Sequence, residues 1–148
     1  VAPKFIVQGG DSDADEIQNR RFLVGNYFLP AEFKNHHRHF RGAVAMARNY
    51  GDNKDKVSTS FDFYIVLGKK HKKIQLDAVE RDNNIKYTET DVKKYETFGG
   101  TPHLDFQHTV FGEVISGLEV AEKISKQKAD SREWPIEDIK MQIEIIQE

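Results

Sequence analysis

The stretch "HLDFQHTVFGEVISGLEVAEKI", residues 103–124, combines two periodicities that predict a strand followed directly by a helix. Residues 108–115 are rich in valine, phenylalanine and isoleucine, which favour extended structure. Apolar residues then recur at helical spacing, at Leu118, Ala121 and Ile124. Residues 117–127 are therefore expected to form an amphipathic helix that covers a sheet with one face.

Four further segments predict strands around this unit, namely residues 5–8, 41–48, 61–68 and 139–146. The first ends at a double glycine, which is a turn signal. In the second, the small residues Ala43, Ala45 and Ala47 alternate with larger ones. The last alternates Ile139, Met141, Ile143 and Ile145 with polar residues and is expected to close the sheet. Several strands, one clear helix and many turns predict a mainly β barrel or sandwich.

The remaining segments have weaker patterns. Residues 11–21 are polar and predict a loop, and residues 22–33 contain Gly25 and Pro30, which predicts extended structure. Residues 69–96 are highly charged, and their sparse apolar residues at helical spacing are Ile74, Val79, Val92 and Tyr95. Thr90 is expected to cap a short helix that begins at Asp91.

Composition excludes several classes of function. The chain has 148 residues, the usual size of one domain, and its net charge of −2 gives no basic field for nucleic acid. Cysteine is absent, which excludes disulfides, thiolate metal sites and cysteine nucleophiles. No apolar stretch is long enough to span a membrane. The chain begins at Val1 rather than methionine, so both cytoplasm and periplasm stay open as its compartment.

Two patterns resemble metal sites but are incomplete. Asp11, Asp13 and Asp15 imitate the start of a calcium loop, yet the required glycine and closing glutamate are absent. Adjacent histidines in an extended segment point to opposite faces, so "HHRH" is interpreted as a solvated surface loop and not as a zinc site. Its histidines are His36, His37 and His39. We expect neither a metal nor a cofactor, and interpret the basic run 69–73 as a solvated turn.

Four blocks in a fixed order resemble the cyclophilins, which are peptidyl-prolyl cis–trans isomerases. They are "FIVQGGD", "RGAVAMA", "FDFYIV" and residues 103–124. The match spans nearly the whole chain except residues 69–98, which look like an insertion in a loop. It implies one domain over residues 1–148 with the family fold, a closed antiparallel β-barrel with capping helices. The first strands and the first helix of that fold are expected to be missing from this chain.

The resemblance implies that the protein assists folding by accelerating rotation about Xaa-Pro bonds in unfolded or partly folded polypeptides. The C–N bond resists rotation by about 18–20 kcal/mol, so the uncatalysed reaction is slow. An enzyme needs only to bind the twisted state better, with an apolar slot for proline and donors around it. Cyclosporin-like cyclic peptides are further expected ligands.

The resemblance also assigns site residues. Gln8, Phe5 and His108 match the family's catalytic positions. Substrate-binding positions are matched by Ile6, Ala47, Arg48, Asn49, Asp62, Tyr64, His103 and Leu104. Within that set, residues 47–49 are expected to bind through their backbone, and His103 lies at a rim position. Family members usually have phenylalanine where this chain has Tyr64, whose added hydroxyl needs a partner.

Two departures from the family bear on activity. The family's catalytic arginine would fall immediately before Val1, and Asp62 replaces a glutamine near that arginine. Our hypothesis is that Asp62 pairs with the arginine through a charge-assisted bond and lowers turnover. The alternative function is a catalytically weak or inactive module that binds proline peptides as a chaperone.

Overall fold

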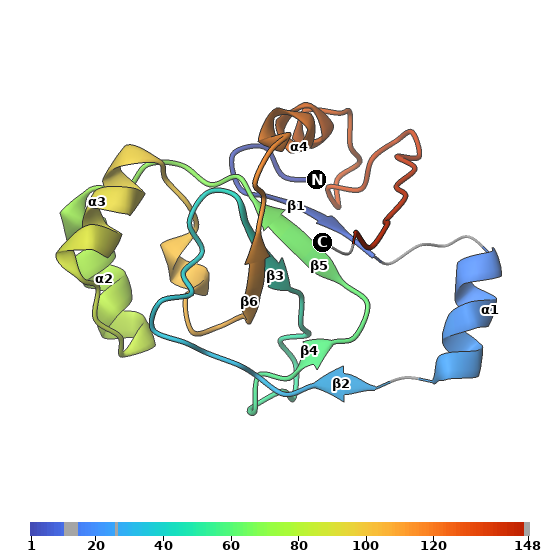
Figure 1. Ribbon diagram of the computed structural model, residues 1–148, viewed down its shortest axis with the longest axis horizontal. Coiled ribbons are helices and arrows are strands. Elements are labelled where there is room, and N and C mark those ends of the chain that lie inside the picture. The colour runs from blue at the N-terminus through green and yellow to red at the C-terminus, as the bar shows by residue number, and fades with distance from the viewer. Residues whose placement is uncertain (11–14, 26, 147–148) are drawn as a thin grey trace.

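The centre of the fold is an open antiparallel sheet whose strand order is β1-β5-β3-β6. The computed structural model describes residues 1–10, 15–25 and 27–146. The strands of this sheet are β1 (Ile6–Gly9), β3 (Ala43–Met46), β5 (Phe63–Val66) and β6 (Val110–Glu113). Figure 1 shows the sheet between helices that lie on either side. The predicted strands at residues 5–8, 41–48, 61–68 and 108–115 are confirmed.

Alternation along these strands builds the core. Ala43 and Ala45 are buried on β3 while Val44 and Met46 are only partly buried, as the period of a half-covered strand requires. Ala45 lies opposite Tyr64 of β5. The small side chain of Ala45 leaves room for the Tyr64 ring beside it. The buried core cluster consists of Ala43, Ala45, Ala47, Tyr64, Val66 and Leu104.

The predicted amphipathic helix is confirmed as α4 (Leu118–Ser125). It packs against β1, and Figure 1 shows it above that strand. Ala121 and Ser125 are buried against the sheet, while Val120 is exposed. One face of α4 thus covers the sheet, in agreement with its sequence pattern.

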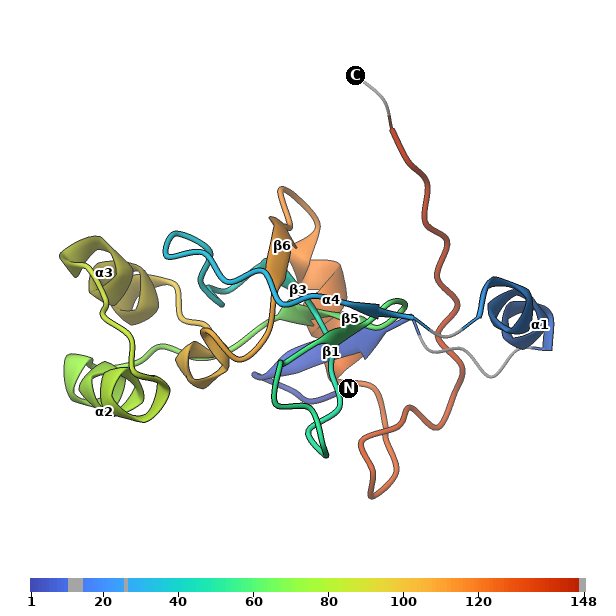
Figure 2. The ribbon, with the colours of Figure 1, turned by 90° about the horizontal axis from the view of Figure 1, so that it is seen from below.

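The charged insertion folds into two helices, α2 (Lys73–Asn83) and α3 (Glu89–Thr97). Both lie at one end of the molecule in two perpendicular views (Figures 1 and 2). The cap of α3 is Thr88 rather than Thr90. The Thr88 hydroxyl accepts the backbone N–H of Asp91, and the Asp91 carboxylate accepts the backbone N–H of Thr88. Tyr95 is fully buried as its spacing predicts, but Ile74 is 75% exposed and Leu76 takes the buried position.

Helix α1 (Asp15–Val24) replaces the predicted loop and the start of the predicted extended segment. Nothing in this stretch breaks a helix before Gly25, whose N–H bonds the carbonyl of Arg21 at 2.8 Å. The helix has no apolar face, so the search for amphipathic spacing missed it. Beyond it, β2 (Phe28–Leu29) pairs with β4 (Ser58–Thr59) in a separate two-stranded sheet.

The closing strand predicted at residues 139–146 is wrong, because no described residue of that segment pairs with a strand. Figure 2 shows this segment extending away from the sheet. An alternating pattern forms a strand only where a partner strand supplies hydrogen bonds, and here the four apolar side chains are 40–90% exposed. In the described residues the sheet is therefore open and the fold is mixed α and β, rather than a mainly β closed barrel.

None of the described helices combines the length and the apolar composition that a membrane span requires.

A tight chain crossing near residues 99–100 holds the segment before β3 in place. Thr101 N–H donates to the carbonyl of His39 at 2.9 Å, and Gly100 N–H donates to the carbonyl of Lys69 at 3.0 Å. A Cβ atom on Gly100 would lie 2.2 Å from the carbonyl oxygen of His39, and φ of Gly100 is +150°. Only glycine fits this close approach.

We expect Gly100→Ala to lower the free energy of unfolding by about 2 kcal/mol or more, because the backbone of His39 must move. Gly51→Ala is the matched control, since a Cβ there meets nothing within 4 Å. Urea unfolding followed by circular dichroism measures both. Equal stabilities of the two variants would contradict the proposed crowding at Gly100.

Candidate functional site

A cavity of about 190 Å³ lies between β1, the end of β3, the turn before β5 and the short 3-10 helix η1 (Pro102–Leu104). Its lining residues are Phe5, Ile6, Gln8, Ala47, Arg48, Asn49, Tyr50, Thr59, Asp62, Tyr64, Leu104 and His108. Chain segments up to about a hundred residues apart in sequence thus meet at one place. The cavity has an apolar interior and a polar border.

The structure brings together the predicted site residues with one exception. His103 does not line the cavity; its ring stacks on that of Phe5, with centroids 5.6 Å apart and planes at 18°. This places His103 at the border, beside the apolar wall. The prediction missed Tyr50 and Thr59. Tyr50 directly follows the matched stretch 47–49, which is the only sequence signal for it, and Thr59 has none.

The apolar wall is fixed by the sheet. The carbonyl of Phe5 accepts the N–H groups of Leu67 and Gly68, both at 2.9 Å, which anchors the start of β1 to the end of β5. Tyr64 and Leu104 are 2% and 7% exposed and pack in the same core cluster. A side chain inserted between them would meet a rigid surface, because core packing holds these rotamers.

Backbone groups border the opposite side. Ala47 N–H donates to the carbonyl of Asp62, and the carbonyl of Ala47 accepts the N–H of Thr59, both at 3.0 Å. Both backbone groups of Ala47 are thus engaged within the protein. Any backbone contact to a ligand from this stretch therefore falls to Arg48 and Asn49.

The Arg48 side chain links this border to the segment that carries His108. Its Nε donates to the carbonyl of Gln107 at 2.7 Å, and its guanidinium lies 4.3 Å from the centroid of the Tyr50 ring. The Tyr50 hydroxyl in turn bonds Nε2 of His108. This contact makes Tyr50 part of the site.

His108 is a neutral group in this setting. It is 6% exposed, and its Nδ1 donates to the carbonyl of Met46 at 3.1 Å. Burial, which disfavours the imidazolium, lowers the pKa of His108 to about 4. With Nδ1 protonated, Nε2 accepts the Tyr50 hydroxyl.

Asp62 places a carboxylate in the cavity. Its Oδ2 accepts the Thr59 hydroxyl at 3.1 Å, and the residue is 9% exposed. The carboxylate is close to the backbone of residue 47, since the same Thr59 hydroxyl also lies 3.3 Å from the carbonyl of Ala47. The site therefore carries an acidic group beside an otherwise apolar slot.

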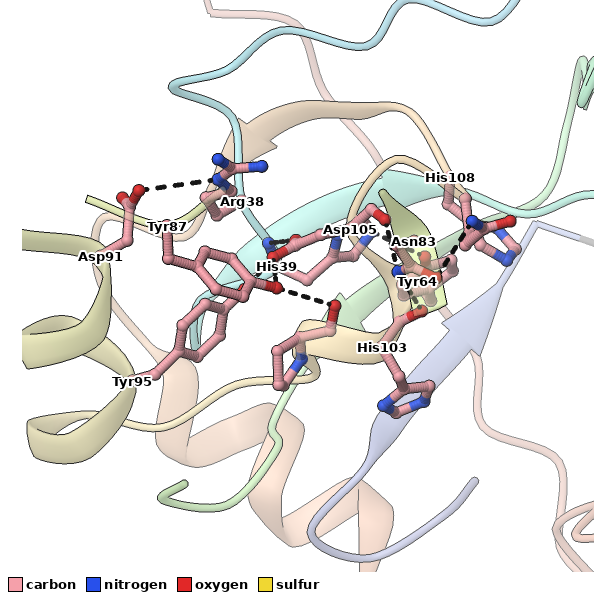
Figure 3. A network of polar contacts seen from close by, with 12 residues as sticks. Arg38, His39, Tyr64, Asn83, Tyr87, Asp91, Tyr95, His103, Asp105 and His108 are labelled. Carbon is pink, nitrogen blue, oxygen red and sulfur yellow. Dashed lines mark hydrogen bonds and ion pairs between the residues drawn. The ribbon is translucent and has the colours of Figure 1, made fainter. Parts of the chain in front are cut away.

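The hydroxyl of Tyr64 points away from the cavity. It bonds Nε2 of His39 at 3.0 Å, and His39 bonds the carboxylate of Asp105 (Figure 3). Both partners are fully buried. The prediction that His39 lies on a solvated surface loop is wrong, because a buried carboxylate 66 residues later in the chain satisfies it. Of the three histidines, His36 is exposed, His37 is partly buried and His39 is buried.

In the described part of the chain, histidine and acidic side chains form no group of three or more that is placed to hold a metal ion. Asp11 and Asp13 of the incomplete calcium pattern lie outside the described residues, and Asp15 begins α1. The arrangement offers an apolar slot bordered by hydrogen-bonding groups. Such a site suits binding and distortion of a peptide segment.

Comparison with known proteins agrees with this geometry. The model of the family described as cyclophilin type peptidyl-prolyl cis-trans isomerase/CLD matches residues 1–145. Proteins named "Putative peptidyl-prolyl cis-trans isomerase" are similar to the chain. The one from Staphylococcus haemolyticus is 30% identical over 139 residues, which is 94% of this chain and 65% of the relative.

The protein of that name from Staphylococcus saprophyticus is 32% identical over 148 residues, 99% of this chain and 70% of the relative. That from Staphylococcus epidermidis is 32% identical over 139 residues, 94% of this chain and 66% of the relative. The chain thus spans about two thirds of the length of the curated relatives it matches.

The lowered pKa of His108 predicts a pH dependence of stability. The unfolded state, where histidine titrates near 6.5, binds more protons between pH 6.5 and about 4. The free energy of unfolding therefore falls as pH falls through this window, by roughly 3 kcal/mol in total from this residue. Urea unfolding between pH 7 and pH 4 should show a smaller decrease for His108→Gln than for the wild type.

His36→Gln is the control, since this exposed side chain should leave the wild-type pH dependence unchanged. A decrease in His108→Gln as large as that of the wild type would show that His108 does not carry the effect.

Proposed function

The chain belongs to the cyclophilin family of peptidyl-prolyl cis–trans isomerases, and on that premise we propose that the protein accelerates rotation about Xaa-Pro bonds in unfolded or partly folded polypeptides. The observation that carries the proposal is the apolar slot between Phe5, Tyr64 and Leu104, bordered by hydrogen-bonding groups. Its dimensions and chemistry suit one proline ring with its flanking peptide groups. The chain spans about two thirds of the length of its curated relatives, and the activity is therefore stated as a proposal.

Within this proposal, each side of the slot has a role. Phe5, Ile6 and Leu104 pack on the proline ring, and His103 covers its border. The backbone of Arg48 and Asn49 binds the residue before proline. Gln8 lies exposed at the end of β1, where its amide is able to donate to the carbonyl that precedes the proline nitrogen.

Rotation needs no bond to be formed or broken other than hydrogen bonds. Twisting removes the C–N resonance and leaves a lone pair on the proline nitrogen. A site that holds the ring and the preceding carbonyl at an angle twisted out of the amide plane binds the twisted state better than either planar state. Fixed donors around the slot do this without reorganising.

The second candidate is a proline-peptide-binding chaperone module with weak or no turnover. The carboxylate of Asp62 favours it, because a fixed negative charge in the slot repels the carbonyl oxygens of a peptide. Cyclosporin-like cyclic peptides discriminate between the candidates. An enzyme is inhibited by them, whereas an inactive module binds them without isomerising any peptide.

The closed barrel of the family also stays a prediction for this protein.

We expect Phe5→Ala to reduce kcat/KM for a proline peptide by at least about tenfold, because the slot loses one apolar wall. A protease-coupled isomerisation assay measures the rate. Phe111→Ala is the matched control, since that ring is 56% exposed on β6 and does not line the cavity. Equal losses in the two variants would remove the slot from the mechanism.

We expect Asp62→Gln to raise the isomerisation rate, because the variant removes the negative charge but keeps a polar side chain in the slot. The hypothesis attributes the effect to pairing of this charge with the family's catalytic arginine, so the assay is run on the natural protein. Asp77→Asn, a partly exposed ion-paired position on α2 outside the slot, controls for a change in net charge. An unchanged rate in Asp62→Gln refutes the hypothesis.

A further inference from the structure

The ring of Tyr64 belongs to the slot, but its hydroxyl belongs to a buried polar chain. The hydroxyl lies 3.0 Å from Nε2 of His39, and Nδ1 of His39 lies 2.9 Å from Oδ1 of Asp105. Figure 3 shows these three side chains gathered at the centre of the network. His39 and Asp105 are fully buried, and neither lines the slot.

Asp105 is a buried anion whose hydrogen-bonding capacity is filled. Its Oδ1 accepts the backbone N–H and the Nδ1–H of His39, at 2.7 and 2.9 Å. Its Oδ2 accepts the hydroxyls of Tyr87 and Tyr95, at 2.8 and 2.6 Å. A carboxylate without such partners would be very costly to bury, so this set of donors fixes where Asp105 lies.

The Asp105 carboxylate determines which atoms donate and which accept along this series of hydrogen bonds. An ionised carboxylate only accepts hydrogen bonds, so Nδ1 of His39 carries a proton. The other ring nitrogen then accepts from the Tyr64 hydroxyl when the imidazole is neutral and donates to it when the imidazole is charged. The hydroxyl of Tyr64 is held in both cases. Burial also raises the pKa of Tyr64, so the hydroxyl keeps its proton.

The held ring is in contact with the site histidine. The rings of Tyr64 and His108 meet edge to face, with centroids 5.5 Å apart and planes at 80°. The rings of His39 and Tyr64 stack with centroids 6.0 Å apart. A tilt of Tyr64 would therefore change both the floor of the slot and the position of His108.

Two of the four donors come from the insertion. Tyr95 lies on α3, and Tyr87 lies between α2 and α3. Asn83, the last residue of α2, adds a bond from its amide to the backbone carbonyl of Asp105 at 2.9 Å. The helical pair thus reaches the slot through Asp105 and through η1, where Asn83 donates to the carbonyl of His103 and Tyr87 to that of Pro102.

Building on the proposed function, we propose that His39 and Asp105 are positioning residues that hold the Tyr64 ring in the floor of the proline slot, and that the α2–α3 pair supports them through Tyr87 and Tyr95. The insertion then contributes to the reaction without touching the substrate. Removing the hydroxyl of Tyr95 on α3 is expected to affect the slot through the same series of hydrogen bonds as removing the hydroxyl of Tyr64.

Three tyrosine-to-phenylalanine variants test this, because each removes one hydroxyl and leaves the packing volume unchanged. We expect Tyr64→Phe and Tyr95→Phe each to lower kcat/KM about three- to tenfold, the range that one hydrogen bond supplies. Tyr27→Phe is the control, since Tyr27 is 51% exposed and lies outside the slot. The double variant should lose no more than about twofold beyond the larger single loss, as residues acting through one chain are not additive.

Nitrogen NMR of histidine-labelled protein gives a readout that does not depend on activity. We expect the His39 Nε2 resonance to shift in Tyr64→Phe and in Tyr95→Phe, and to stay unchanged in Tyr27→Phe. Wild-type kcat/KM in Tyr95→Phe, or fully additive losses in the double variant, would overturn the proposal. A wild type that isomerises no peptide contradicts the proposed function instead. In that case, unchanged His39 resonances in Tyr64→Phe and Tyr95→Phe would also refute the positioning role of His39 and Asp105.

Discussion

The carboxylate of Asp105 is a buried negative charge that has no access to water, and the arrangement of the site follows from how the protein satisfies it. Its donors come from the segment before β3, from the loop between α2 and α3, and from α3 itself. Each donor must approach within hydrogen-bonding distance, so these three segments have little freedom to move relative to one another. Leu104, which lines the slot, is the neighbouring residue, and it is placed by the same constraint.

The strands that build the slot were predictable because their signal is local. Small residues alternate along 41–48, and an apolar run fills 61–68, so each strand is specified by its own period. The same reasoning failed at residues 139–146, where the period is clear but the described structure offers no strand to pair with. It also failed at α1, whose residues are compatible with a helix but show no apolar face.

The site was predictable as far as its residues lie in segments that resemble the family. The role of His39 was not predictable, because it depends on Asp105, a residue distant in sequence. A histidine beside two others in a polar segment is typical of a surface loop. The hydroxyl of Tyr64 was the useful clue: a buried phenol needs a partner, and the partner is that histidine. Thr59 and Tyr50 enter the site through contacts with Asp62 and His108, which no local pattern records.

Whether this slot lowers the barrier to rotation about a proline bond is measured directly by exchange NMR on a short Xaa-Pro peptide. We expect catalytic amounts of the protein to cause exchange between the cis and trans resonances of the peptide, and cyclosporin to abolish this exchange. Peptide resonances that shift on binding while cis and trans fail to exchange would contradict it and leave only a binding module.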